Sequence, residues 1–96
     1  MAHSKRNIIH EKSLAFAIRI VKLTQFLSKE KNEFLLSKQI LRAGTSIGAL
    51  VKESEYAQSK KDFISKLSIA LKEAAETNYW LLVLKETDYI SVAQFD

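Results

Sequence analysis

The sequence contains no cysteine and no proline, and only two glycines among its 96 residues. Without cysteine, the chain can form neither a disulfide framework nor a metal site built from thiolates. Without proline and with little glycine, it has few residues that break helices, so long helices are favoured. No apolar run approaches the roughly 20 residues that a membrane-spanning helix needs. These absences predict a helical protein of a reducing compartment, and we expect it in the cytoplasm with no membrane partner.

Charge is distributed unevenly along a chain of otherwise ordinary globular composition. Hydrophobic residues make up 47% of the chain and charged residues 27%, so we expect one folded domain over residues 1–96. Residues 1–72 carry a net charge of +8, whereas residues 73–96 carry −4. A basic body with an acidic end suits an acidic partner or pairing between copies of the chain. The alternative is a solvated surface of mixed charge, which is common in globular proteins.

Hydrophobic periodicity predicts three long helices, over about residues 9–29, 34–56 and 60–85. Polar segments at residues 29–33 and 58–62 separate them, and Ser59 is suited to cap the third helix together with Asp62. Ser91 begins a further helix of which only a stub lies within the chain. Matched helix lengths and short turns predict an all-α, antiparallel up-down four-helix bundle, with the fourth helix largely missing from this chain.

The first and third helices each carry two apolar lines instead of one. In the first helix, one line consists of Leu14, Ala17, Ile18 and Val21, and the other of Phe16, Ile20, Leu23 and Leu27. In the third, the core line is Phe63, Leu67, Ala70, Ala74, Leu81 and Leu84, and the second line is Ile64, Leu71, Ala75 and Leu82. A helix buried on one side needs only the first of its lines. The second line on the first helix predicts contact with another subunit or, alternatively, a helix wedged between two neighbours of its own domain.

The second helix carries small residues on one face and an arginine and a glutamate on the other. Gly44 and Gly48 are four residues apart, which lets another backbone approach closely. Arg42, Ser46 and Glu53 lie on the opposite face. Because Arg42 and Glu53 are too far apart along the helix to pair with each other, we predict that each bonds a neighbouring helix. We therefore interpret these five residues as structural helix-packing residues.

These segments resemble the four-helix-bundle family of proteins encoded in intervening sequences of bacterial 23S rRNA genes. The resemblance covers roughly residues 8 to 90 and is carried by residues 16–22, 36–49, 62–73 and 76–81, together with Glu53. Its most specific part is the motif that runs from Arg42 to Glu53. The resemblance implies an antiparallel four-helix bundle that assembles as a ring, commonly a pentamer, with no established activity. The chain departs from the family pattern at Leu50, where an asparagine is frequent, and in lacking most of helix four.

The fold is also similar to that of the accessory variability protein of diversity-generating retroelements. That relative is a basic pentameric barrel that binds nucleic acid and a reverse transcriptase. The similarity implies that nucleic acid and a protein are possible partners of this chain, beside further copies of itself.

Groups that catalyse reactions or bind metals are scarce in the sequence. His3 and His10 have no third ligand nearby, and zinc sites need three or four protein ligands. Glu73 and Glu76 share a helix face, where a solvated pair or pairing with Arg42 is a commoner role than acid–base catalysis. We therefore predict no catalytic residue, no metal and no cofactor, and a protein that is not an enzyme.

The functional hypothesis, nucleic-acid binding, depends on basic residues. Lys12, Arg19, Lys22 and Lys29 share one arc of the first helix, with Phe26 among them. We expect non-specific binding of RNA or single-stranded DNA to the following residues: Lys12, Arg19, Lys22, Lys29, Lys60, Lys61 and Lys66. The alternative is a structural or protein-interaction module whose basic residues only keep it soluble. A third alternative is an enzyme whose catalytic groups are assembled between subunits, and no residue pattern in the sequence supports it.

Overall fold

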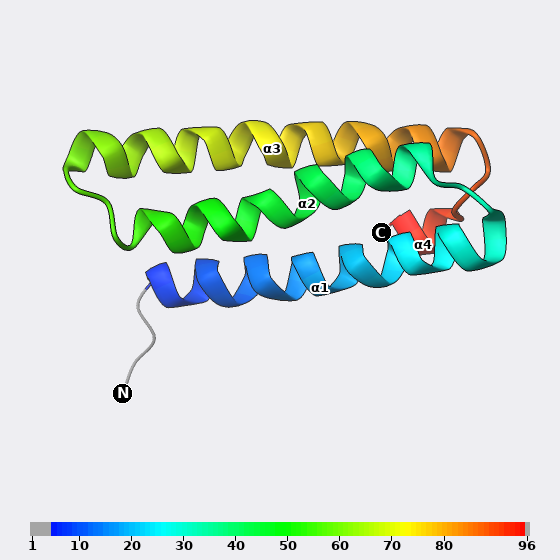
Figure 1. Ribbon diagram of the computed structural model, residues 1–96, viewed down its shortest axis with the longest axis horizontal. Helices are drawn as coiled ribbons and strands as arrows, with labels where there is room; N and C mark the ends of the chain where they lie inside the picture. Colours follow the sequence, from blue (N-terminus) through cyan, green and yellow to red (C-terminus); the bar gives the residue numbers. More distant parts are fainter. Residues whose placement is uncertain (1–4, 96) are drawn as a thin grey trace.

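The computed structural model describes residues 5–95, with side chains from residue 8 onward. It contains α1 (Lys5–Lys31), α2 (Leu35–Ser54), α3 (Lys60–Glu86) and the short α4 (Val92–Phe95), and the described range has no strand. The three long helices run antiparallel in succession, and α4 turns back from the end of α3, the helix that it contacts (Figure 1). The predicted all-α bundle is confirmed, with helix ends within four residues of those expected and a fourth helix present only as a stub.

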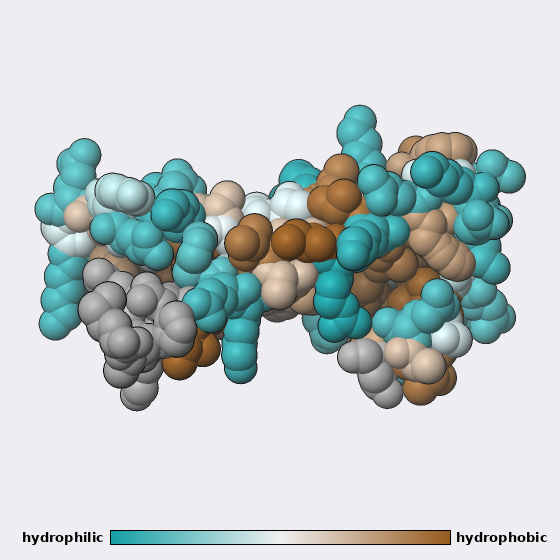
Figure 2. All heavy atoms as spheres, turned by 90° about the horizontal axis from the view of Figure 1, so that it is seen from below, coloured by the Kyte–Doolittle hydropathy of each residue, from teal (hydrophilic) through white to brown (hydrophobic). Residues whose placement is uncertain are grey.

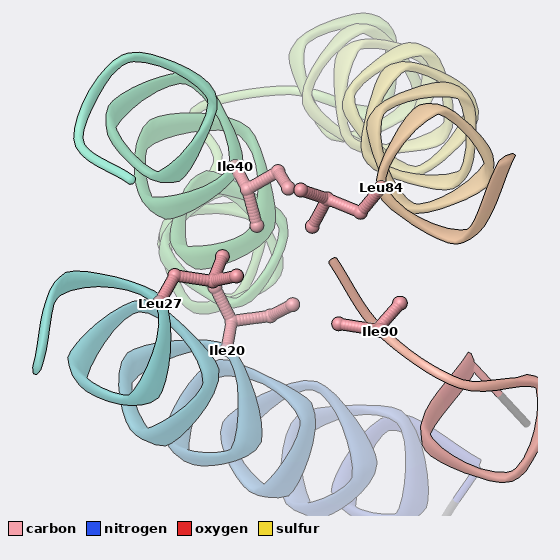
Figure 3. Packing of buried hydrophobic residues seen from close by; sticks show 5 residues of the cluster. All are labelled: Ile20, Leu27, Ile40, Leu84 and Ile90. Carbon is pink, nitrogen blue, oxygen red and sulfur yellow. The ribbon is translucent and has the colours of Figure 1, made fainter. Parts of the chain in front are cut away.

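The helix α2 packs against both of its long neighbours, whereas the backbones of α1 and α3 do not approach each other within the described range. Viewed end-on, α1, α2 and α3 occupy three corners, and the segment around Ile90 enters the fourth (Figure 3). The buried cluster consists of Ile20, Leu27, Ile40, Leu84 and Ile90. The best-covered part of the core therefore lies at the α4 end, where four chain segments meet.

The core line of α1 is the second of its two predicted lines. Ile20 and Leu27 are buried and Phe16 and Leu23 pack against the core. Of the other line, Ala17 is half-buried, and Leu14, Ile18 and Val21 are exposed. The assumption that the first line is the inward one is wrong, because the close approach of α2 turns the Ile20 side of α1 inward. In α3 the expected core line is at least half-buried, and the line Ile64, Leu71, Ala75 and Leu82 is exposed.

The two glycines of α2 lie where another helix approaches, as the sequence predicts, and that helix is α1. A Cβ atom at Gly44 would lie 2.8 Å from Cγ1 and 2.9 Å from Cγ2 of Ile20. A Cβ atom at Gly48 would lie 3.4 Å from the carbonyl oxygen of Ser13. Neither glycine has a positive φ, so what requires glycine is space and not backbone conformation. Gly44 marks the tight point of the helix crossing, and Gly48 lies beside it at ordinary contact distance.

Side chains cap the starts of the last three helices. At α3, the backbone N–H of Asp62 donates to Ser59 Oγ at 3.0 Å, as expected. The return bond differs from the prediction, since the Asp62 carboxylate accepts from the backbone N–H of Gln58 and not from that of Ser59. At α4, the backbone N–H of Gln94 donates to Ser91 Oγ, which confirms the predicted cap.

The start of α2 is capped by a residue that the sequence reading left in a polar turn. Phe34 occupies the N-cap position and makes no side-chain cap. The carboxylate of Glu33 instead accepts from the backbone N–H groups of Leu35, Leu36 and Ser37. Burial raises the pKa of the Glu33 carboxyl, but the bonds from Ser37, Leu36 and Leu35 outweigh burial and hold this pKa below its usual range.

Candidate nucleic-acid interface

Four basic side chains follow one side of α1 along most of its length. All four are exposed: Lys12, Arg19, Lys22 and Lys29. The first and last of them, Lys12 and Lys29, are 17 residues apart along the helix, which corresponds to about 26 Å. Within the described range, the ion pairs engage Arg42, Lys52 and Lys85 and none of these four. The stripe therefore presents uncompensated positive charge to solvent.

Phe26 lies within this stripe and is half-buried. The Nζ atom of Lys31 lies 5.8 Å from the centre of the Phe26 ring, a cation–π contact. This lysine belongs to the last turn of α1 and adds a further charge near the Lys29 end. A ring already contacted by a cation offers less open surface for stacking on a base.

The three lysines predicted on α3 do not join the stripe into one surface. Lys60 and Lys61 are exposed in the first turn of α3, at the same end of the molecule as the start of α1 (Figure 1). Lys66 is half-buried. Because the backbones of α1 and α3 do not meet, Lys60 and Lys61 form a separate basic group near the Lys12 end of the stripe.

Arg42 joins α2 to α3 through two carboxylates. Its Nη1 lies 3.2 Å from Glu73 Oε2, and its Nη2 donates to Glu76 Oε2. The same Glu76 oxygen accepts from the indole N–H of Trp80 at 3.2 Å. The predicted pairing of Arg42 with another helix is made, although the Arg42 side chain is 52% exposed. The two glutamates are therefore occupied in a surface network between helices, and Trp80 extends it by one helical turn.

The other polar residues predicted to pack helices behave differently. The Ser46 hydroxyl donates to the carbonyl oxygen of Ala43 in its own helix. Glu53 is exposed, and no described residue bonds its carboxylate, so its predicted bond to a neighbouring helix is absent within this range. Among the described residues, Arg42 therefore joins this face of α2 to α3 and Glu53 does not.

Comparison with known proteins now identifies the family. The family model of the 23S rRNA-intervening sequence protein matches residues 5–96. The chain belongs to this family. A solved crystal structure from Bacteroides thetaiotaomicron VPI-5482, described as a protein of unknown function from the S23 ribosomal protein family, is 59% identical. It aligns with a TM-score of 0.94 over 96% of this chain and 82% of its own. No curated protein matches the chain.

The resemblance stated from the sequence is therefore confirmed, and neither match names a catalytic activity. The described part of this family member also holds no cluster of three or more histidine, cysteine, aspartate or glutamate side chains that would suit a metal. His3 lies outside the described residues. His10 is half-buried, and its Nδ1 atom is buried without a hydrogen-bond partner. No helix in the described range is long and apolar enough to span a membrane.

Sequence reasoning missed two contributors to the geometry of this family member. Trp80 stands four residues after Glu76, a spacing that places both on one helix face, but the hydrogen bond between them was not predicted. Lys12 and Arg19 were assigned only to a stripe, yet both also border hollows between α1 and the other helices. No sequence signal identifies those hollows, because they depend on how far α1 and α3 stand apart.

Proposed function

We propose that this protein is a non-enzymatic helical bundle that self-associates and binds RNA or single-stranded DNA without sequence specificity. The observation that carries the proposal is the stripe of Lys12, Arg19, Lys22 and Lys29, whose four charges are exposed and unpaired among the described residues. Cations of this kind bind phosphates by releasing condensed counterions, and such binding does not depend on base sequence. The absence of cysteine supports a cytoplasmic site of action.

Self-association is supported by apolar surface that one copy leaves uncovered. Leu14 and Ile18 on α1 are 52% and 48% exposed, and Leu71 on α3 is 73% exposed. Exposed apolar side chains that share a helix face, as Leu14 and Ile18 do, mark sites of protein contact. In a ring, for which the family resemblance favours a pentamer, the stripe recurs in every copy. Several modest basic surfaces then act together, which raises the overall affinity for one nucleic-acid strand.

A role without catalysis is supported by the state of the two glutamates that were candidates for acid–base work. Glu73 and Glu76 are engaged by Arg42, and Glu76 also by Trp80. Carboxylate oxygens that are already engaged by an arginine and an indole N–H are less available to a substrate. Under this proposal the network joins α2 to α3 and takes no part in a reaction.

The second candidate function is a structural or protein-interaction module without a nucleic-acid role. It is favoured by the same exposed apolar side chains, since these suit protein partners and contribute little to phosphate binding. Under this alternative, the stripe contributes only to solubility. The two candidates differ in one measurable property, which is salt-sensitive binding of nucleic acid.

The test is fluorescence anisotropy with a labelled RNA of mixed sequence at low salt. We expect binding at micromolar protein that weakens steeply as salt is added. The double variant Arg19→Glu with Lys22→Glu should abolish binding. The matched control, Lys38→Glu with Lys72→Glu, changes the net charge equally at exposed positions on α2 and α3 and should retain most of it. Loss of binding in both variants alike, or no binding by the native protein, leaves the structural module as the surviving function.

A further inference from the structure

The turn between α1 and α2 carries two large apolar side chains in solvent. Phe34 and Leu35 are 61% and 81% exposed, at the end of the bundle where α1 stops and α2 starts (Figure 1). The other phenylalanines are all half-buried, namely Phe16, Phe26, Phe63 and Phe95. Seen from the side of α1, hydrophobic and hydrophilic side chains are intermixed around this end of the molecule (Figure 2). A single exposed apolar residue is ordinary on a protein surface, so the way in which the Phe34 ring is held, and its neighbours, determine what it can bind.

The backbone on both sides of Phe34 is fixed by hydrogen bonds. Before it, Asn32 adopts a left-handed conformation with a φ of 52°, and the backbone N–H of Glu33 donates to the carbonyl oxygen of Leu27 at 2.9 Å. After it, the Glu33 carboxylate accepts from the backbone N–H groups of the first turn of α2. Because the turn is held at both ends, little conformational entropy is lost when a ligand contacts the Phe34 ring.

Phe34 also differs from the other exposed aromatic residues in having an open ring. The ring of Tyr56 has Lys52 Nζ 5.8 Å from its centre, and the ring of Tyr79 lies edge-on to that of Trp80 at 5.3 Å. Among the described residues, neither a cation nor another aromatic ring contacts Phe34. Its ring is therefore available to a flat partner.

This open ring lies near one end of the basic stripe. Lys29, the last residue of the stripe, precedes Phe34 by five residues, which separates the two by at most about 18 Å. Lys31 lies between them in the sequence and is exposed as well. Glu30 is an exposed acidic residue nearby, whereas Glu33 is buried with its carboxylate against backbone N–H groups. Because the lysines lie so close to the ring, a strand whose phosphates contact Lys29 can bring a neighbouring base to Phe34.

We propose that Phe34 is a stacking platform for an unpaired base of an RNA or single-stranded DNA that runs along the basic stripe. Proteins that bind single strands combine a cationic track with aromatic rings, and any base can stack because every base has a π-face. In a duplex the bases are already paired and stacked, so the protein meets mainly phosphates. The platform makes binding selective for single strands, whereas the stripe alone does not distinguish a single strand from a duplex. This inference rests on the proposed binding of nucleic acid.

The test compares a labelled RNA strand of mixed sequence, which does not pair with itself, with the same strand annealed to its complement. Both RNAs are titrated with the full chain at low salt, and fluorescence anisotropy measures binding. We expect Phe34→Leu, which keeps an apolar side chain but removes the ring, to weaken binding of the single strand at least about fivefold and to leave duplex binding unchanged. The slope of affinity against salt should stay as in the native protein, since no phosphate contact is lost.

Two further variants serve as controls. Phe34→Trp keeps an aromatic ring and should bind the single strand at least as tightly as the native protein. Tyr79→Leu removes a ring of similar exposure, 59%, from α3 and should leave binding of both RNAs unchanged. Because Phe34 is exposed and the cap of α2 is supplied by Glu33, the Phe34 variants should keep the helical circular dichroism spectrum of the native protein.

The stacking inference and the proposed function fail in different ways. If the native protein binds neither RNA, both are wrong. If Arg19→Glu with Lys22→Glu abolishes RNA binding but Phe34→Leu binds the single strand as the native protein does, only the stacking inference is overturned. Equal weakening of single-strand and duplex binding by Phe34→Leu also overturns it, because the ring would then not act on unpaired bases. Altered sedimentation of Phe34→Leu overturns it too, since Phe34 would then contact another copy of the chain.

Discussion

Glu33 and Ser37 bond each other in both directions at the start of α2. The Glu33 carboxylate accepts from the backbone N–H of Ser37 at 2.8 Å, and the Ser37 hydroxyl donates to the carbonyl oxygen of Glu33 at 2.6 Å. Both side chains are buried. Since the first N–H groups of a helix have no partner within it, this arrangement supplies what the N-cap residue Phe34 lacks.

We expect Glu33→Ala to lower the free energy of unfolding by about 1–2 kcal/mol at neutral pH, the usual effect of losing a helix cap. Because the folded-state pKa of Glu33 is lowered, its contribution is complete above the unfolded pKa and is lost as pH falls through the folded pKa. Urea unfolding from pH 7 downward measures this. Glu33→Gln should flatten part of the acid decline. An unchanged pH profile in that variant would show that Glu33 is not the titrating group.

Gly44 and Gly48 should respond in opposite ways to alanine. At Gly44, a new Cβ meets the buried, branched side chain of Ile20, so we expect Gly44→Ala to destabilise by about 1–3 kcal/mol through overpacking. At Gly48 the contact distance is ordinary, and the gain in helix propensity, about 1 kcal/mol, should make Gly48→Ala neutral or stabilising. Thermal unfolding of the two single variants compares them directly. Equal effects would mean that Ile20 does not set the crossing distance.

The helices were predictable from sequence because their apolar residues recur at the helical period and polar segments separate them. The inward side of α1 was not, because Leu14 and Ile20 both belong to lines with that period. The choice between them depends on where Gly44 admits α1, which is a tertiary contact. The cap by Glu33 was not predicted either, because a glutamate in a polar turn ordinarily lies in solvent.

The candidate site likewise has features that the sequence predicted and features that it did not. Exposure of the basic stripe was predictable, because unpaired lysine and arginine side chains are rarely buried. The bridge from Arg42 to Glu73 and Glu76 was foreseen as an alternative to catalysis, but its exposure was not. The hollows that Lys12 and Arg19 border depend on the separation of α1 and α3, which no spacing within one helix encodes.

Arg42→Ala should destabilise only modestly. The side chain is half-exposed, and exposed ion pairs contribute about 0.2–1 kcal/mol each, so we expect a total near 1 kcal/mol. This is well below the roughly 3–5 kcal/mol that breaking a buried pair requires. A double-mutant cycle with Glu76→Gln separates the pairwise contribution, and added salt should reduce it. A loss above 3 kcal/mol would indicate that the pair is buried in an assembly.

Asp88→Gly should stabilise the end of α3. Asp88 has a φ of 64°, a left-handed conformation that disfavours residues with a Cβ. The turn is fixed by bonds from the backbone N–H groups of Asp88 to Lys85 and of Tyr89 to Leu84, at 3.1 and 2.9 Å. Glycine removes the strain and keeps both bonds, so we expect a gain of about 1 kcal/mol in chemical denaturation. Asp88→Ala is the control, and it should not share that gain.

Self-association should depend on the exposed apolar line of α1 and not on exposed apolar residues in general. Leu14 and Ile18 lie one turn apart on that line, and we expect Leu14→Gln with Ile18→Gln to convert the oligomer to monomer at micromolar concentration. Neither change alters charge, and both positions are about half-exposed, so the helical spectrum should be unchanged. Leu35→Gln is the control, because Leu35 is 81% exposed on α2, away from this line.

Sedimentation velocity measures the outcome. A native protein that sediments as a monomer at high micromolar concentration would contradict self-association, whereas an oligomer that survives the double change would place its interface on another face. If the ring concentrates the basic stripe, the monomeric variant should also bind RNA more weakly, although all four stripe residues remain in place.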